Sequence, residues 1–373
     1  MIRIFYPQKD ASIYERLPSR NTGIDQILEL NKNVSGESGP DQSDQSYTWE
    51  DTYNSRILIK FDTATVQQQI SSGLITGQKK FYLSLKAAEA AALPVEYTIH
   101  AHALSQSWVN GNGHYWDSPQ QTNGVSWTYR NSKNSNVQWK SSSYATNSTG
   151  SWSSQGGGGT WYTTYTTSQS FSHDSPDVRM DVTSIVNAWL SGSVANDGFI
   201  LKFSNADEKS TDVLGSIKFF SKETHTIYIP KLEVEYSNES FAGTGSFTLI
   251  NTDNYVVYFK NIRDSYKENQ LVKLRLGVRP RYPQKTYSTS SAYLDSWRLP
   301  SSSYYSIVDV PSGETVFANS TLGTKVGCDA TGNYIQLDMN SFLPERYYKI
   351  MLHINDQQEV SIIDDGFYFK VQR

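Results

Sequence analysis

The sequence of 373 residues carries a formal net charge of −4. This balance argues against a general nucleic-acid or anionic-membrane binder, which is normally basic. The length predicts two domains that each bury a core, and the single cysteine, Cys328, excludes an intrachain disulfide.

The chain begins with a strand-like run at residues 2–6, without the basic and apolar stretches that mark a signal peptide. No stretch approaches the roughly 18–20 apolar residues of a membrane span. We therefore expect a protein without a membrane span that is folded in a cytoplasm.

Short strand-like runs recur along the first two thirds of the chain. Phe81, Leu83 and Leu85 alternate with polar residues, which is the period of a half-buried strand. The composition, with 25 tyrosines and 13% aromatic residues, also favours strands. Further strands are predicted at 2–6, 11–15, 55–62, 97–104, 198–203, 217–221 and 230–236.

Two helical segments are predicted among these strands, at residues 63–71 and 182–190. In the second, apolar residues stand at i, i+3, i+4 and i+7 from Val182 and form a single stripe. Asp181 or Thr183 is placed to cap its start, and Gly192 lies just past its end.

Polar segments separate these elements. Residues 33–49 and 140–172 are rich in small polar residues. The first predicts a loop and the second a loop or ribbon, and the glycine run at 156–159 predicts a flexible loop. A boundary falls near 237–246. Beyond it, strands are predicted at 255–260, 271–279, 304–310, 334–339, 347–354 and 360–371. We therefore expect domains at 1–238 and 239–373, the second a smaller immunoglobulin-like β-sandwich that serves as an interaction domain.

Metal ligands are weakly indicated. His100 and His102 stand two apart on a predicted strand, so they share a face and offer two of the three ligands of a metal site. An exposed polar strand face explains the pair better. Structural calcium is a minor alternative in the loop with Asp41, Asp44, Glu50 and Asp51, although EF-hand spacing is absent. We assign no metal or cofactor residue.

Catalytic motifs are not found in the sequence. It has no Gly-x-Ser-x-Gly elbow, and Cys328 has no histidine motif nearby, which favours a buried, inert thiol. The glycine run at 156–159 lacks the Lys-Ser or Lys-Thr of a phosphate-binding loop. No carboxylate pair stands out as that of a glycosidase. We therefore expect a protein that is not an enzyme.

Tryptophans in or beside polar loops are the first candidate for a binding face. Flat rings beside amide and hydroxyl groups suit stacking on sugars, and they equally suit a protein interface. Trp108 and Trp127 are expected to close the core instead. The candidate binding-face aromatics are Trp116, Trp139, Trp152 and Trp161.

A basic strand is the second candidate. Lys273, Arg275 and Arg279 alternate along residues 273–279, so they share one face. An acidic partner surface would complement them. A solvated strand face is the competing interpretation.

The first half resembles the DNRLRE family, the disaggregatase-related β-sandwich modules. The likeness rests on motifs that occur in order at residues 10–14, 21–24, 55–62, 107–108, 124–127, 181–192, 196–199, 219–223 and 230–236. The resemblance implies a non-catalytic jelly-roll module, similar to a carbohydrate-binding module and containing a short helix. Such modules are commonly attached to proteins that handle polysaccharides.

The second half resembles small β-domains of tailed-phage structural proteins, through residues 304–310, 312–315, 328–335, 343–349 and 367–371. This likeness implies a non-enzymatic virion protein, an accessory of the neck, tail or capsid surface. It would be folded in the host cytoplasm and docked in multiple copies onto other virion proteins. The alternative is a polysaccharide-binding module on a cell or virion surface.

Overall fold

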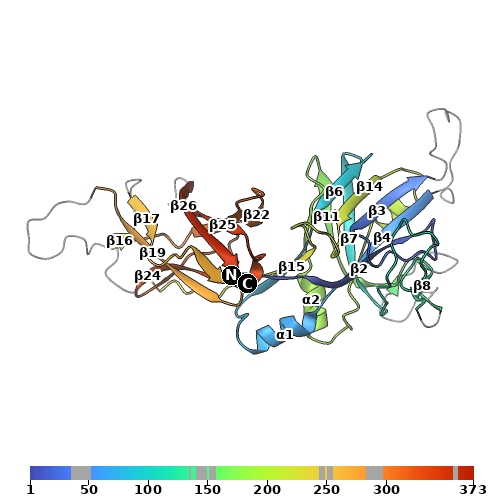
Figure 1. Ribbon diagram of the computed structural model, residues 1–373, viewed down its shortest axis with the longest axis horizontal. Helices are drawn as coiled ribbons and strands as arrows, with labels where there is room; N and C mark the ends of the chain where they lie inside the picture. Colours follow the sequence, from blue (N-terminus) through green and yellow to red (C-terminus); the bar gives the residue numbers. More distant parts are fainter. Residues whose placement is uncertain are drawn as a thin grey trace, which may run out of the picture. The chain divides into compact units, whose positions relative to one another are not determined.

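The computed structural model is mainly β-strand, with several antiparallel sheets and a few short helices, so the predicted all-β class is confirmed (Figure 1). It describes residues 1–34, 52–133, 136–139, 149–150, 157–242, 248–249, 255–282, 297–355 and 360–373. Among these residues, no helix has the length and apolar character needed to cross a membrane.

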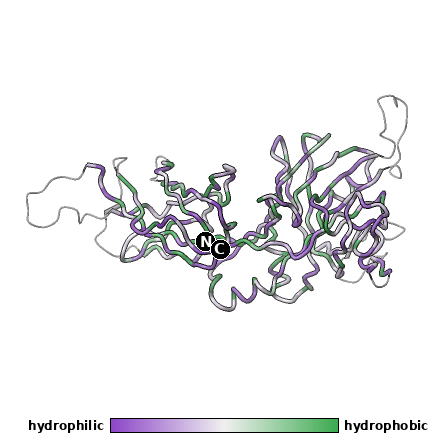
Figure 2. The backbone as a smooth tube through the Cα atoms, in the orientation of Figure 1, coloured by the Kyte–Doolittle hydropathy of each residue, from purple (hydrophilic) through white to green (hydrophobic). Residues whose placement is uncertain are grey.

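The chain divides into two compact units. The N-terminal unit comprises Phe5–Gln69 and Lys80–Glu233, and the C-terminal unit comprises Met1–Ile4, Ile70–Lys79 and Val234–Arg373. The predicted domains, 1–238 and 239–373, stay a prediction. Figure 2 shows hydrophilic and hydrophobic residues closely interleaved along the chain in both units, as expected of strands with two different faces.

The N-terminal unit is built on a nine-stranded sheet of order β10-β11-β7-β13-β4-β3-β14-β6, in which β2 also pairs with β4. Its strands are β2 (Pro7–Tyr14), β3 (Ile27–Val34), β4 (Thr52–Phe61), β6 (Ala87–Ala91), β7 (Glu96–Leu104), β10 (Thr149–Gly150), β11 (Trp161–Ser172), β13 (Phe199–Lys202) and β14 (Gly215–Phe220). The smaller pairs are β5 (Lys79–Leu85) with β12 (Val178–Asp181) and β8 (Tyr129–Asn131) with β9 (Val137–Gln138). In β4, the successive residues Ile57, Leu58 and Ile59 are fully buried, so both faces of the sheet are covered there.

Short helices accompany this sheet: α1 (Thr63–Ser71), α2 (Thr183–Leu190) and α3 (Asn205–Lys209). Both predicted helices are confirmed. In α2, Ile185, Val186 and Trp189 are buried, as the apolar stripe predicts. The Thr183 N–H donates to Asp181 Oδ1 at 2.9 Å, and Gly192 lies just past the helix with a φ of +75°.

A loop or ribbon is predicted at 140–172, and over its last third Trp161–Ser172 forms the twelve-residue strand β11, so the loop alternative is wrong there. Strand β11 pairs with β7 in antiparallel fashion, and most of its residues are Thr, Ser or Tyr. Only Trp161 and Phe171 are buried in β11, so the sequence lacks the alternation of apolar and polar residues that would predict a strand there. Threonine and tyrosine are nevertheless common in strands, so the residue types of this segment are compatible with a strand although its polar composition suggests a loop.

The loop predicted at 156–159 is a loop over its described residues, and it is buried. Gly157, Gly158 and Gly159 are buried and adopt φ values of +104°, +72° and +87°. A Cβ at Gly157 would lie 2.7 Å from the Trp127 carbonyl oxygen. These glycines therefore allow a left-handed backbone to pass closely under packed side chains. Gly156 lies outside the described residues.

The C-terminal unit contains two larger sheets. One has the order β17-β19-β24-β23, and the other has the order β18-β26-β25-β21-β22. Their strands are β17 (Tyr255–Phe259), β18 (Ser265–Lys267), β19 (Leu271–Pro280), β21 (Ser303–Asp309), β22 (Thr315–Phe317), β23 (Gly327–Asp329), β24 (Gly332–Asp338), β25 (Tyr347–Asn355) and β26 (Val360–Gln372). The remaining elements are β1 (Ile2–Phe5), β15 (Lys231–Tyr236), the parallel pair β16 (Thr248–Leu249) and β20 (Trp297–Arg298), and the 3-10 helix η2 (Met339–Ser341).

Strand β26 contains a bulge. Ile350 pairs with Phe367 and Leu352 pairs with Ile363, so three residues of β26, 364–366, stand opposite the single Met351 of β25. Gly366 has a φ of +71°, which fits a glycine in such a bulge. On its other side, β26 pairs within the described chain only at its end, where Lys370 to Gln372 meet β18.

Asp10 is a buried acid within the N-terminal unit. Its side chain is 2% exposed, and Oδ2 accepts a 2.6 Å hydrogen bond from the Lys222 N–H. Burial raises the pKa of Asp10 to about 7. The hydrogen bond from the Lys222 N–H and the positive charge of Lys222 lower this pKa, but burial has the larger effect. The folded protein therefore binds a proton at Asp10 that the unfolded chain has already lost above about pH 4.

We expect this proton to make stability depend on pH. Because the folded pKa is raised, stability falls as the pH rises between about 4 and 7, with a steepest slope of about 1.4 kcal/mol per pH unit, and levels off above. Asp10→Asn keeps an oxygen for Lys222 and removes this slope. Urea unfolding from pH 4 to 8 checks it, with the exposed Asp212→Asn as control. An unchanged slope in Asp10→Asn would contradict the assignment.

Candidate binding site

The most exposed large aromatic side chain among the described residues is Trp116, at 86%. It lies in a loop that internal hydrogen bonds hold in place. The His114 N–H donates to Asp117 Oδ2 at 2.8 Å, and the Tyr115 N–H donates to Asp25 Oδ2 at 3.1 Å. The backbone of the loop that carries Trp116 is therefore held by hydrogen bonds, while the Trp116 ring itself is exposed to water.

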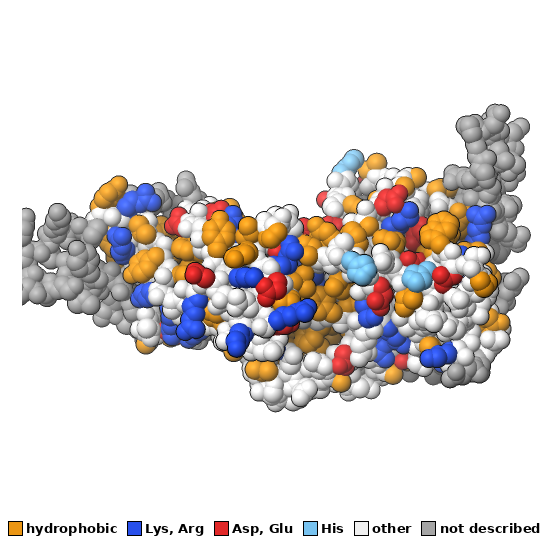
Figure 3. All heavy atoms as spheres, viewed as in Figure 1, with side chains coloured by type: hydrophobic (Ala, Val, Ile, Leu, Met, Phe, Trp, Pro, Cys, Tyr) orange, Lys and Arg blue, Asp and Glu red, His pale blue; other side chains and the backbone are white. Residues whose placement is uncertain are grey.

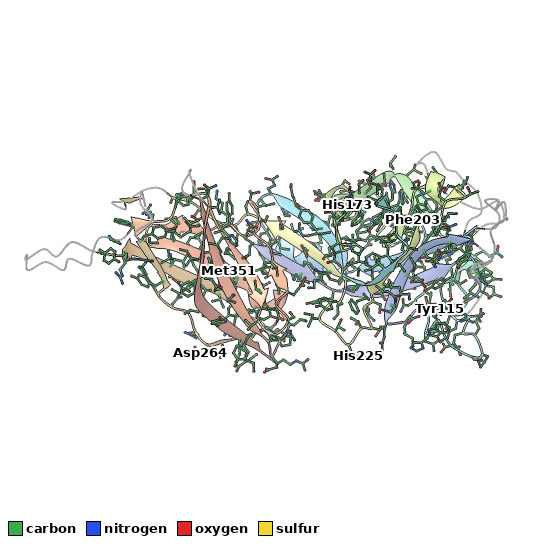
Figure 4. The ribbon with its side chains drawn as sticks, turned by 90° about the horizontal axis from the view of Figure 1, so that it is seen from above. Tyr115, His173, Phe203, His225, Asp264 and Met351 are labelled. Atoms are coloured by element: carbon green, nitrogen blue, oxygen red, sulfur yellow. The ribbon has the colours of Figure 1, made fainter. Side chains whose placement is uncertain are left out.

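Two tyrosines connect Trp116 to the core. The Tyr115 ring meets Trp116 edge to face, with centroids 4.8 Å apart, and lies 5.0 Å from the buried ring of Tyr14. Such tilted pairs contribute roughly 0.5–1.5 kcal/mol beyond the area that they bury. Figure 4 labels Tyr115 at the periphery of the N-terminal unit. The exposed ring of Trp116 thus rests on a row of aromatic side chains that leads inward to strand β2.

Two arginines border these rings. The Arg20 guanidinium donates from Nη1 to the Tyr115 carbonyl oxygen and lies 5.6 Å from the centre of the Tyr115 ring. The Arg16 guanidinium lies 5.3 Å from the centre of the Tyr53 ring. We call these five residues, Arg16, Arg20, Tyr53, Tyr115 and Trp116, the Trp116 surface.

The charges of the Trp116 surface act on one another. Burial and then Glu29 raise the pKa of the Tyr115 hydroxyl, while Arg20 and Arg16 oppose the shift. Glu29 Oε1 accepts a 2.8 Å hydrogen bond from the Ser216 hydroxyl. Within the described part of the chain, neither arginine has a carboxylate oxygen within ion-pair distance. The surface therefore offers two cationic groups beside the exposed ring of Trp116 and the half-buried rings of Tyr53 and Tyr115.

The other predicted tryptophans lie elsewhere. Trp139 and Trp161 are 2% and 1% exposed and pack in a core cluster, which corrects their prediction as binding-face residues. Trp108 and Trp127 belong to the same cluster, as expected. Trp152 lies outside the described residues.

A buried charged group explains why Trp161 points inward. Glu208 accepts from Arg56 Nε at 2.9 Å and Arg56 Nη2 at 2.7 Å, and it forms an ion pair with Lys202 Nζ at 2.9 Å. The Arg56 guanidinium lies 4.7 Å from the Trp127 ring centre and 5.2 Å from that of Trp161. We call Arg56, Lys202 and Glu208 the buried charge cluster. The tryptophans cover its cations, and cation–π attraction is strong where water is excluded.

The predicted histidine pair borders this cluster. His100 and His102 share a face of β7, with ring centroids 6.1 Å apart. Burial, and then Lys202, lowers the pKa of His102 to about 3. Two nearby cations, Lys202 and Arg56, disfavour a metal ion there. In the described ranges, no group of three or more His, Cys, Asp or Glu side chains is arranged to hold a metal ion, and Asp41, Asp44, Glu50 and Asp51 lie outside those ranges.

The predicted basic face belongs to β19. Lys273, Arg275 and Arg279 stand at alternate positions, but the first two converge on Asp329, with N–O distances of 2.9 and 2.6 Å. The ring of Tyr334 lies 3.7 Å from Lys273 Nζ. Arg279 donates to the Pro280 carbonyl oxygen at 3.2 Å. Because Asp329 pairs with Lys273 and Arg275, the predicted strand is less cationic than its sequence suggests. Figure 3 shows both basic and acidic side chains on the face in view.

Cys328 is fully buried, and burial raises the pKa of its thiol. A thiol in that state is weakly nucleophilic, as the sequence predicted.

The sequence predicted Trp116 as a binding-face residue but did not predict the residues that surround it. Arg20 and Tyr115 are 95 residues apart in the chain. The local signal was the adjacent Tyr115 and Trp116 in a polar loop, and nothing in the sequence linked this pair to Arg16, Arg20 or Tyr53.

The fold and this surface define a β-rich protein with several sheets and an exposed aromatic surface. No protein-family model matches the chain, and no curated protein matches its sequence.

Proposed function

We propose that this chain is a non-enzymatic structural protein of a tailed-phage virion, an accessory of the neck, tail or capsid surface that acts by docking. The observation that carries a binding role is Trp116, 86% exposed on a braced loop. Exposing so much apolar surface is unfavourable in water, and a binding partner that covers it recovers that free energy.

The virion assignment is supported by the sequence resemblance of the C-terminal half. The residues that carry this likeness are largely parts of the C-terminal sheets: 304–310 covers most of β21, and 367–371 lies in β26. In this proposal the C-terminal unit docks onto other virion proteins, and the N-terminal unit presents the Trp116 surface.

The resemblance of the first half supports a module rather than a catalytic centre. The amide of Asn21 donates to the Asn110 and Val125 carbonyl oxygens at 2.7 and 2.8 Å. The amide of Asn196 donates to the Phe61 carbonyl oxygen at 2.9 Å, and Asp10 accepts from the Lys222 N–H. Asn21 thus joins loops to one another, and Asn196 and Asp10 join loops to strands β4 and β2, so these motif residues have structural roles that support the likeness.

The alternative is a polysaccharide-binding module on a cell or virion surface, and the same Trp116 surface favours it, because an exposed aromatic ring can stack on a sugar ring. Peptide mass spectrometry of density-purified particles tests the virion role. We expect the chain in a fixed copy number per particle. Its absence from particles and recovery from the cell or medium fraction would reject the virion role and leave the polysaccharide module.

A further inference from the structure

We propose that the outer face of the five-stranded sheet in the C-terminal unit packs against the same face of a second copy of this chain. The inference goes beyond the proposed function, because it concerns the contact between copies and not the particle to which they attach. It does not involve the Trp116 surface.

Strand β25 shows which side of this sheet faces the core. Buried residues alternate along it with more exposed ones from Tyr347 to Asn355. Ile350 and Leu352 are fully buried, whereas Tyr347 is exposed and Met351 is half-buried on the opposite side. Figure 4 labels Met351 among the strands of the C-terminal unit. The outer side of the sheet therefore carries side chains that the core does not use.

The strand register shows which residues share that outer side, because directly opposed residues of antiparallel strands point to the same face. Val308 of β21 and Tyr368 of β26 both stand opposite Lys349 of β25. Ile362 and Val360 of β26 stand opposite later outward residues of β25. We call the apolar members of this side the Met351 face: Val308, Tyr347, Met351, Val360, Ile362 and Tyr368.

The Met351 face leaves a large apolar area in water. Val360, Ile362, Tyr347 and Tyr368 are 61%, 58%, 51% and 48% exposed. With about 150–250 Å² for a whole large side chain, these four alone leave on the order of 400 Å² uncovered. That area lies in the range of the largest apolar patch on a typical monomer, and patches of this size mark interaction sites.

The area also fits a contact between two copies. Two such faces would together bury on the order of 800 Å² from these four residues, and the surrounding rim would bring the total toward the roughly 1,200–2,000 Å² of a specific interface. Sheets pack face to face with interdigitating side chains about 10 Å apart. Met351 suits such a contact, because the unbranched methionine side chain adapts to the shape of a partner.

The charges on this side of the sheet point to a second copy as the partner. Lys349 pairs with Asp364 at 2.7 Å, and Lys370 pairs with Glu345 at 2.5 Å. Each of these cations is balanced within the chain, so the face offers little attraction to nucleic acid, an anionic membrane or a strongly charged protein. A two-fold interface places a surface against itself, and a face with balanced charges does not repel its own image.

Sedimentation velocity of the full chain, from about 1 to 100 µM, tests the proposal, since interfaces near the standard size reach at least micromolar affinity. We expect a reversible equilibrium between one and two copies that does not weaken as salt is added, because apolar contacts are not screened. Ile362→Lys is expected to weaken association roughly tenfold or more, because each copy would then bury an unpaired ammonium group.

The matched control is Leu271→Lys. Leu271 is 50% exposed on β19, in the other large sheet of the same unit, so the same change of charge there should leave association unchanged. Val360→Lys is a second variant of the Met351 face, with the same expected effect as Ile362→Lys. Both positions are exposed, and a thermal melt of each variant shows that it is folded.

Several outcomes would overturn the inference. These are a chain that stays monomeric over the whole range, association that survives both lysine variants of the Met351 face, or equal weakening by Leu271→Lys. Loss of association in Trp116→Ala alone would assign the contact to the Trp116 surface instead. Particle mass spectrometry is independent of all these results, so failure of this contact is distinguishable from failure of the virion role.

Discussion

Glu208→Ala is expected to lower the free energy of unfolding of the N-terminal unit by about 3–5 kcal/mol, the usual cost of removing one partner from a buried ion pair. Glu208 is fully buried, and its carboxylate meets Arg56 and Lys202, which are 0% and 1% exposed. Its loss leaves two buried cations without a counter-charge. Burial alone would raise the pKa of Glu208, but Arg56 and Lys202 outweigh burial and hold that pKa below its usual value.

Urea unfolding followed by tryptophan fluorescence measures this loss, since Trp127 and Trp161 lie over Arg56. The exposed Lys209→Ala in the same helix is the control. Because the folded pKa of Glu208 is depressed, its contribution is present above about pH 4.5 and is lost as the pH falls through the folded pKa. A loss below about 1 kcal/mol in Glu208→Ala would show that the cluster does not need its carboxylate.

The second large effect is expected at Gly158→Ala. The φ of Gly158 is +72°, a conformation that costs a residue with a Cβ roughly 1–2 kcal/mol. The added methyl group would also overlap the Arg56 guanidinium and lie 2.9 Å from the Trp127 ring. Arg56 donates to the Gly158 carbonyl oxygen, so moving either group disturbs the buried charge cluster. We expect a total loss of about 3 kcal/mol or more.

Gly192→Ala is a matched control for this prediction. Its φ is +75°, and a Cβ there meets nothing within 4 Å. It should therefore show only the backbone cost, about 1–2 kcal/mol. The difference between the two variants in the same unfolding experiment measures the contact with Arg56 and Trp127. Equal losses would mean that the glycine run tolerates a side chain and that only its backbone conformation matters.

Local patterns predicted the elements whose apolar residues are periodic. The stripe from Val182 gives α2, and the alternation at Phe81, Leu83 and Leu85 gives β5. Strand β11 was predicted only as part of a loop or ribbon, because its own apolar residues do not alternate. A polar strand beside β7 needs only the backbone pairing that β7 supplies.

The tryptophans show why the site was only partly predictable. Trp116, Trp139 and Trp161 all stand in or near polar, glycine-rich sequence, yet only Trp116 is exposed. The burial of Trp161 depends on Arg56 and Lys202, which belong to strands remote in the chain. The basic strand β19 also depends on residues remote in the sequence. Asp329 of β23 pairs with Lys273 and Arg275 and so reduces the positive charge that the sequence of β19 alone predicts. Local sequence identifies the side chains, and only the fold decides which of them reach the surface.

The bulge at 364–366 has a consequence for how the protein behaves when it is concentrated. A strand edge with unpaired N–H and C=O groups invites another chain to add a strand, and repetition of that step grows fibres. In β26 the bulge breaks the straight run of such groups, and Asp364 within it accepts a 2.7 Å hydrogen bond from Lys349 Nζ of β25. Val360 and Ile362, which precede the bulge, are 61% and 58% exposed, so the bulge ends the exposed aliphatic part of the strand. The irregularity thus interrupts the strand edge along which another chain could add a strand.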